Sequence, residues 1–205
     1  MVGGMADEDP LIARAAAGDA RAFRDLYERH RKDVARLAAR MLDGRSDLED
    51  IIQEVFVQVH KSIKYFRGDA KFGTWLHRVT VNVVLMHRRA AKSRPAFSSS
   101  TVDATITDTR EIRPDEDVER RQRVRAFARL LDRLADKKRI VFVLHELEGM
   151  APDEIAKVVG APVLTVRTRL FYARRELEAM LSQEPTLSGL GVEFSNAARA
   201  RGTTP

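Results

Sequence analysis

The fold is decided by the stretch from residue 151 to residue 172, whose sequence is APDEIAKVVGAPVLTVRTRLFY. Pro152 suits the first turn of a short helix, and the two acidic residues after it lie where the helix dipole favours negative charge. Gly160 suits the left-handed position that ends a helix, and Pro162 can open the next one. A short helix, a glycine turn and a second helix are typical of a helix-turn-helix.

The second helix of this pair has an apolar side and a basic side. Apolar residues recur at helical spacing from Val166 to Leu181, and basic and aromatic residues point away from them. Arg167 suits a bidentate pair with guanine, and Thr168 suits a thymine methyl. The residues expected to contact duplex DNA are Thr165, Arg167, Thr168, Arg169, Phe171, Tyr172, Arg174 and Arg175. The alternative, a solvated arginine-rich helix, leaves the glycine turn and Phe171 unexplained.

The chain upstream of this motif also has helical period. One apolar stripe runs from Leu48 to Phe66 and a second from Phe72 to Met86, both in steps of three or four residues. Residues 67–71 form a break between them, and no segment alternates with period two for long. Basic and aromatic residues crowd this break, a combination that suits single-stranded DNA, because cations follow phosphates and rings stack on bases. We therefore predict an all-α protein with a helical bundle in this part.

Charge divides the 205 residues into two basic parts with an acidic segment between them. Residues 20–92 carry 16 basic and 9 acidic residues, and residues 120–181 carry 14 and 8. Ser98–Glu119 carries seven acidic residues and only two arginines. The predicted organisation is an N-terminal segment (1–19), a first domain (20–92), a flexible acidic linker (93–119), a second domain (120–181) and a loose tail (182–205). The tail's apolar residues, Leu187, Leu190, Val192 and Phe194, leave docking on a partner as an alternative.

Composition excludes several classes of protein. The formal net charge of +6 favours polyanionic partners such as nucleic acid. The chain has no cysteine, which excludes disulfides and thiolate metal sites, and no apolar run approaches the ~18 residues of a membrane span. It has no glycine-rich phosphate loop, and its five histidines lack paired metal-ligand spacing. We expect a cytoplasmic protein that is not an enzyme, uses no cofactor or metal, and does not insert into membranes.

Both parts, in this order, resemble the extracytoplasmic-function (ECF) sigma factors of bacterial RNA polymerase. Residues 47–56, DLEDIIQEVF, resemble the family's region 2.2, and residues 66–76, FRGDAKFGTWL, resemble regions 2.3 and 2.4. Glu148-Gly149 and the helix-turn-helix resemble region 4. The resemblance covers roughly Phe23 to Leu181, and the linker leaves no room for a region 3 domain.

The resemblance implies that the chain binds core RNA polymerase, at the β′ clamp and β subunits, and promoter DNA, with an anti-sigma factor as a further partner. The implied polymerase-binding residues are Asp47, Asp50, Gln53, Glu54 and Phe56, although Phe56 also has a position that suits the core. The implied contacts to the melted −10 element are Tyr65, Phe66, Arg67, Asp69, Lys71, Phe72, Trp75, Arg78, Asn82, Arg88 and Arg89. Phe72 and Trp75 have core spacing, so packing is the alternative for both. The helix-turn-helix would read the −35 element as duplex, and the acidic linker would pass through the polymerase cleft.

The chain departs from the family's pattern at three places, of which one is Met86-His87 where the family usually has an acidic residue. Leu164 stands where the family usually has glycine, and Thr80-Val81 stands where it usually has an alanine-arginine pair. The rival interpretation is a conventional helix-turn-helix regulator whose first part senses a ligand or dimerises. Such a regulator would bind intact duplex alone, whereas a sigma factor would need core polymerase.

Overall fold

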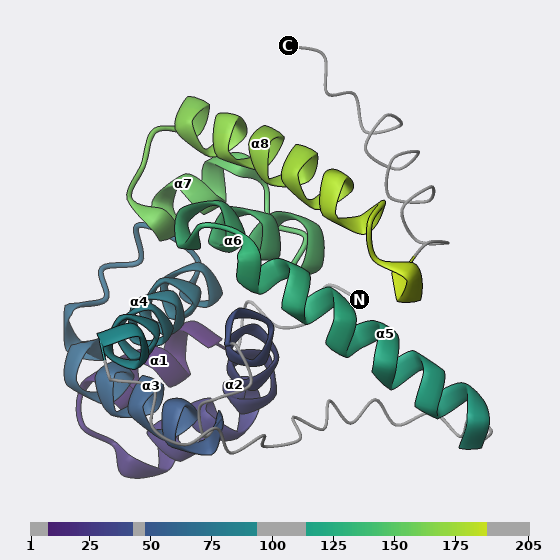
Figure 1. Cartoon of the computed structure of the whole chain (residues 1–205). Helices are drawn as coiled ribbons and strands as arrows, with labels where there is room; N and C mark the ends of the chain where they lie inside the picture. The colour runs from purple at the N-terminus through teal and green to yellow at the C-terminus, as the bar shows by residue number, and fades with distance from the viewer. Residues whose placement is uncertain (1–7, 43–47, 94–113, 188–205) are drawn as a thin grey trace. The chain divides into compact units, whose positions relative to one another are not determined.

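The computed structural model describes residues 8–42, 48–93 and 114–187 (Figure 1). The regular elements in these ranges are all helical, which confirms the all-α prediction. The chain divides into two compact units, Met1–Val102 and Asp103–Pro205, here called the first and second units. Most of the predicted linker, residues 94–113, and the tail residues 188–205 lie outside the described residues, as does Asp47.

The first unit begins with a helix that the sequence did not predict. Within the N-terminal segment, α1 (Glu8–Ala16) packs on α2 (Ala20–Met41) and buries Ile12. Asp19 caps α2, because one carboxylate oxygen accepts the backbone N–H groups of residues 21 and 22 at 2.9 and 3.1 Å. Its other oxygen accepts from Arg14 at 2.9 and 2.5 Å. These hydrogen bonds, the one from the backbone of Ala22 first, lower the pKa of Asp19 below 3.8.

The rest of the first unit is α3 (Leu48–Ser62), a 3₁₀ turn η1 (Ile63–Tyr65) and α4 (Phe72–Ser93), and both α3 and α4 pack on α2. Its core combines residues of all three helices, among them Leu26, Val34, Leu37, Ile52, Val55, Val59, Leu76 and Val84. The predicted stripe of α4 differs at its end, where Met86 is exposed.

The second unit contains α5 (Pro114–Arg133), α6 (Asp136–Phe142), a π-helical turn η2 (Val143–Leu147), α7 (Pro152–Val159), α8 (Val163–Leu181) and a 3₁₀ turn η3 (Pro185–Leu187). α8 packs on α5, α6 and α7, and η3 packs on α5. α5 buries Ala126, Leu130 and Leu131, and Leu134, which follows its last residue, is buried as well, whereas Val124 is exposed.

The ends of the second unit extend past the predicted boundaries. α5 begins at Pro114, inside the segment predicted as linker, because proline suits a first helical turn and the acidic residues 115–117 follow it. Leu187, predicted as part of a loose tail, is buried. Between α5 and α6, the buried Arg139 donates to the Leu131 carbonyl at 2.6 Å and pairs with Asp132 at 2.5 Å.

Candidate nucleic-acid interface

The predicted helix-turn-helix is formed by α7 and α8. The Glu154 carboxylate accepts the backbone N–H of Ala151 at 3.2 Å and so caps the start of α7. α7 ends at Gly160, which has φ 62° and ψ 42°. This left-handed conformation disfavours residues with a side chain and reverses the chain into α8 within three residues.

α8 separates its residues into a buried side and an exposed side. Val166, Leu170, Ala173, Leu177 and Leu181 are buried. The exposed side chains of the predicted DNA contacts are Arg167, Thr168, Phe171, Tyr172 and Arg175, whereas Thr165 and Arg169 are partly buried. Leu164 is exposed as well. Most of the predicted surface is therefore accessible to a ligand along one side of the helix.

Arg174, one of the expected contacts to duplex DNA, is paired within the second unit. Its Nε and Nη2 atoms lie 2.7 and 2.5 Å from Oε1 of Glu146, in η2, and the two side chains are only 12% and 13% exposed. A charge pair this enclosed holds α8 against η2. This pairing gives Arg174 a packing role within the second unit. Spacing within α8 could not show the pair, because Glu146 lies 28 positions earlier in the chain.

Two side chains near the exposed face of α8 have contacts that spacing did not show. The Thr168 hydroxyl donates to the Leu164 carbonyl at 2.9 Å, which leaves its oxygen lone pairs and its methyl group for a base. Lys138, on α6, lies 5.8 Å from the ring centroid of Tyr172 and also pairs with Glu176. Lys138 adds a cation beside α8 that no periodicity in α8 itself would reveal.

In the first unit, the break between η1 and α4 is lined by an aromatic cluster. The ring centroids of Phe66, Phe72 and Trp75 lie 5.4 to 5.6 Å apart, and Phe72 is buried. Phe72 therefore packs in the core, as the alternative for it predicted. Trp75 is partly buried, so packing accounts for only part of its side chain. Tyr65 is 70% exposed, with the Lys64 ammonium 5.0 Å from its ring centroid.

The exposed polar residues around this break lie on the loop and on one side of α4. They are Arg67, Asp69, Lys71, Arg78, Asn82 and Arg89. Arg88 does not join them: it is buried and donates to the Met41 carbonyl at 3.0 Å, which corrects its prediction as a DNA contact. Position 88 continues the buried row of Leu76 and Val84 at intervals of four, a signal already present in the sequence.

Four of the five predicted polymerase-binding residues, Asp50, Gln53, Glu54 and Phe56, lie on α3. Asp50 and Gln53 are exposed, and the Glu54 carboxylate lies 3.3 Å from Nε2 of His87 on α4. Phe56 is largely buried, with its ring centroid 4.6 Å from that of Tyr27. Both interpretations of Phe56 thus have a basis, since it packs on α2 and also lines a cavity.

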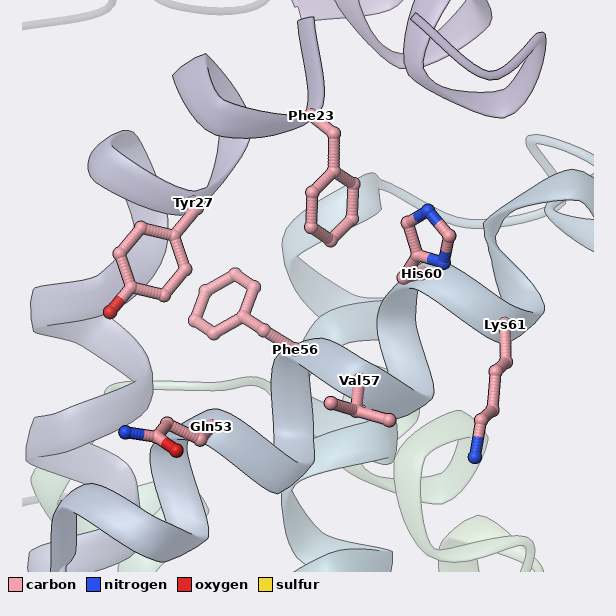
Figure 2. A pocket seen from close by; sticks show the side chains of 7 residues that line it. All are labelled: Phe23, Tyr27, Gln53, Phe56, Val57, His60 and Lys61. Carbon is pink, nitrogen blue, oxygen red and sulfur yellow. The ribbon is translucent and has the colours of Figure 1, made fainter. Parts of the chain in front are cut away.

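An open cavity of about 400 Å³ lies between α2 and α3 (Figure 2). α3 supplies Gln53, Phe56, Val57, His60 and Lys61, and α2 supplies Phe23 and Tyr27. Figure 2 shows the Phe56 ring between the two α2 side chains, with Lys61 at one edge.

Neither a metal-binding cluster nor a membrane-spanning helix occurs in the part of the chain that the structure describes. No His, Asp or Glu side chains gather there in threes as a metal site would require. None of the described helices is both long enough and apolar enough to span a bilayer.

Comparison with known proteins matches both units. The family model for Sigma-70 region 2 matches residues 26–94, and the model for Sigma-70, region 4 matches residues 125–177. The chain is 34% identical over 176 residues to the ECF RNA polymerase sigma-E factor of Escherichia coli K12, covering 82% of this chain and 91% of that one. It is 32% identical over 178 residues to the sigma-E factor of Haemophilus influenzae, covering 83% and 93%.

Two solved structures are similar as well. CnrH, in complex with the cytosolic domain of CnrY, is 30% identical with a TM-score of 0.60, covering 85% of this chain and 96% of that one. The sigma factor RpoE of Bartonella quintana, in complex with the anti-sigma factor NepR, is 17% identical with a TM-score of 0.62, covering 80% and 98%. The second likeness shows a shared fold.

Proposed function

This chain belongs to the extracytoplasmic-function sigma factors of RNA polymerase, and on that premise we propose which of its surfaces bind polymerase and promoter DNA. A sigma factor of this kind binds core polymerase, directs it to specific promoters and promotes initiation. The observation that carries the assignment is the order of the two matches, region 2 in the first unit and region 4 in the second. A conventional helix-turn-helix regulator is less consistent with these matches, because it does not explain why the first unit matches Sigma-70 region 2.

In the second unit, α8 would enter the major groove of the −35 element. Arg167 is exposed near its N-terminal end, where a recognition helix meets base edges, and would donate bidentately to a guanine. Arg169 and Arg175 would contact phosphates and fix the register of the helix. Arg174 is excluded from this set, since its guanidinium is engaged by Glu146.

In the first unit, the exposed Tyr65 and the loop after it would hold the melted −10 strand. Extruding a base costs a few kcal/mol, and stacking on an aromatic ring returns about 1–3 kcal/mol. Tyr65 would supply this ring, and Arg67 and Lys71 would contact nearby phosphates. The cluster of Phe66 with Phe72 and Trp75 would support the loop from within the bundle. On α4, the exposed side of Arg78, Asn82 and Arg89 would continue the path of the strand.

On α3, the exposed side chains of Asp50 and Gln53 would bind the polymerase clamp. Asp50 and Gln53 are one helical turn apart and both exposed, so they present polar groups on one side. Gln53 also borders the cavity between α2 and α3, which would receive an apolar side chain from the partner. Glu54 would contribute less directly, because His87 already faces its carboxylate.

We extend the proposal to place and regulation. The chain would act in the bacterial cytoplasm, where polymerase and promoter DNA are found, and would carry out no catalysis of its own. CnrH, 30% identical to this chain, was solved in complex with the cytosolic domain of CnrY, another protein. This supports a further protein partner for the chain, and an anti-sigma factor is the partner that we propose.

The experiment that tests the function is transcription from a genomic promoter pool by core polymerase, with and without this chain. We expect a discrete set of new transcripts that depends on both proteins. Gln53→Arg, which adds a positive charge beside Asp50 on the α3 surface, should weaken polymerase binding and reduce these transcripts. The matched control is Gln183→Arg, an exposed glutamine beyond α8. Tight binding of intact duplex by the chain alone, with no new transcripts, would instead establish the conventional regulator.

A further inference from the structure

We propose that Leu164 determines promoter specificity by contacting the methyl group of a thymine in the −35 element. The inference rests on the proposed function of α8 and adds to it a base preference and the residue that imposes it. It concerns the second residue of α8, a large apolar side chain that the rest of the second unit leaves exposed.

The position of Leu164 leaves its side chain accessible. It is the second residue of α8, and its 74% exposure is the largest among the large apolar side chains of the described residues. Packing within the second unit therefore does not account for it. The first turns of a recognition helix are the ones that meet base edges.

Leu164 also belongs to a row of exposed residues. The hydrogen bond from the Thr168 hydroxyl to the Leu164 carbonyl joins consecutive turns of the helix at 2.9 Å. Phe171 follows at an interval of seven residues, on the same side of an α-helix, and is 45% exposed. The row thus has an apolar group at each end and a threonine methyl between them.

The chemistry of a leucine side chain restricts what it can select. It has no donor or acceptor, so it gains nothing from the polar edges of guanine, cytosine or adenine. The C5-methyl of thymine is the apolar group of the major groove, and burying it against Leu164 removes both from water. Arg167, one turn further along α8, remains available for a guanine.

The helix geometry limits the distance between the two apolar contacts. Seven residues of α-helix advance about 10.5 Å, and successive base pairs are about 3.4 Å apart. The thymine that Leu164 contacts and the one that Phe171 contacts should therefore lie no more than about three base pairs apart.

The test replaces each thymine of a −35 element with deoxyuridine, which removes only the methyl group. The template is a promoter selected from the pool, and the measured quantity is the half-saturating concentration of holoenzyme. For wild type, one replacement should weaken binding about fourfold, the factor that corresponds to burying one methyl group. For Leu164→Ala, the same replacement should have almost no effect. Phe171→Ala should suppress the effect at a second thymine within about three base pairs of the first.

A matched control is Val124→Ala, since Val124 is an exposed apolar residue of the second unit on α5. This variant should respond to deoxyuridine as wild type does. The inference would be overturned if deoxyuridine weakened the binding of wild type and of Leu164→Ala equally at every thymine. It would also be overturned if Leu164→Ala bound the thymine and the deoxyuridine templates more weakly than wild type by the same factor. A wild-type holoenzyme that uses no promoter at all would overturn the proposed function instead, so the two failures are distinguishable.

Discussion

Replacing Arg174 with methionine separates a packing role from a DNA-binding role for this residue. The methionine keeps the length and apolar contacts of the stem and removes the guanidinium that lies 2.7 and 2.5 Å from Glu146. Breaking a buried ion pair by removing one partner costs about 3–5 kcal/mol. Because both side chains keep slight exposure, we expect the lower end of that range, about 3 kcal/mol.

The assay is hydrogen exchange resolved by peptide, because it reports on each unit separately. A loss of about 3 kcal/mol lowers the protection of the slowest amides in α6 and α8 by roughly 150-fold. The amides of α2–α4 belong to the first unit and serve as an internal reference. Arg175→Met is the matched control, since Arg175 is exposed, and should leave protection unchanged. Combining Glu146→Gln with Arg174→Met should restore much of the loss, because neither charge of the pair is then left buried without the other.

One outcome would refute this account of Arg174. If Arg174→Met kept full protection but bound −35 duplex as poorly as Arg167→Met, the guanidinium would be a phosphate contact. The role predicted from the sequence would then hold, and Glu146 would be only an accessory partner.

Three further predictions concern the first unit. Tyr65→Ala should leave the urea midpoint unchanged and weaken −10 opening by about 1–3 kcal/mol, measured with 2-aminopurine in the non-template strand; undiminished opening would contradict the stacking role. Arg88→Met should destabilise the unit by about 1.5–3 kcal/mol, because the hydrogen bond to the Met41 carbonyl is lost. Urea unfolding monitored by Trp75 fluorescence measures this, and an unchanged midpoint would instead support a DNA contact for Arg88. The pKa of Asp19 is lowered below 3.8, so its stabilising effect should be present above that pH and be lost as the pH falls through the folded-state value. Asp19→Asn should abolish this dependence, and an NMR titration at or above 3.8 would disagree.

The sequence was sufficient for the features that depend on neighbouring residues. Apolar residues at helical intervals define the buried sides of α3 and α8, and Gly160 at its left-handed position defines the turn between α7 and α8. The exposed side of α8, including Arg167 and Phe171, follows from the same periodicity. These predictions held because each depends on the backbone within one or two helical turns.

Arg88 and Met86 show where this reasoning stopped. Helical spacing assigned Met86 to the core and the family resemblance assigned Arg88 to DNA, but the structure exposes Met86 and buries Arg88. The cause is the Met41 carbonyl, which lies 47 positions earlier and accepts from Arg88. A buried cation is tolerated only where such a partner exists, and spacing within one helix carries no information about it.

By itself the sequence was therefore sufficient for most of the helices, α1 excepted, for the apolar sides of α3 and α8 and for the order of the two units, since these follow from local periodicity, turn chemistry and charge. Only the tertiary structure decided which of two neighbouring arginines, Arg174 or Arg175, is engaged within the protein, and that Phe23 and Tyr27 complete a cavity on α3. The physical reason is that a charge or an aromatic ring acquires its role from the groups that face it. Those groups come from distant segments that only the folded chain brings together.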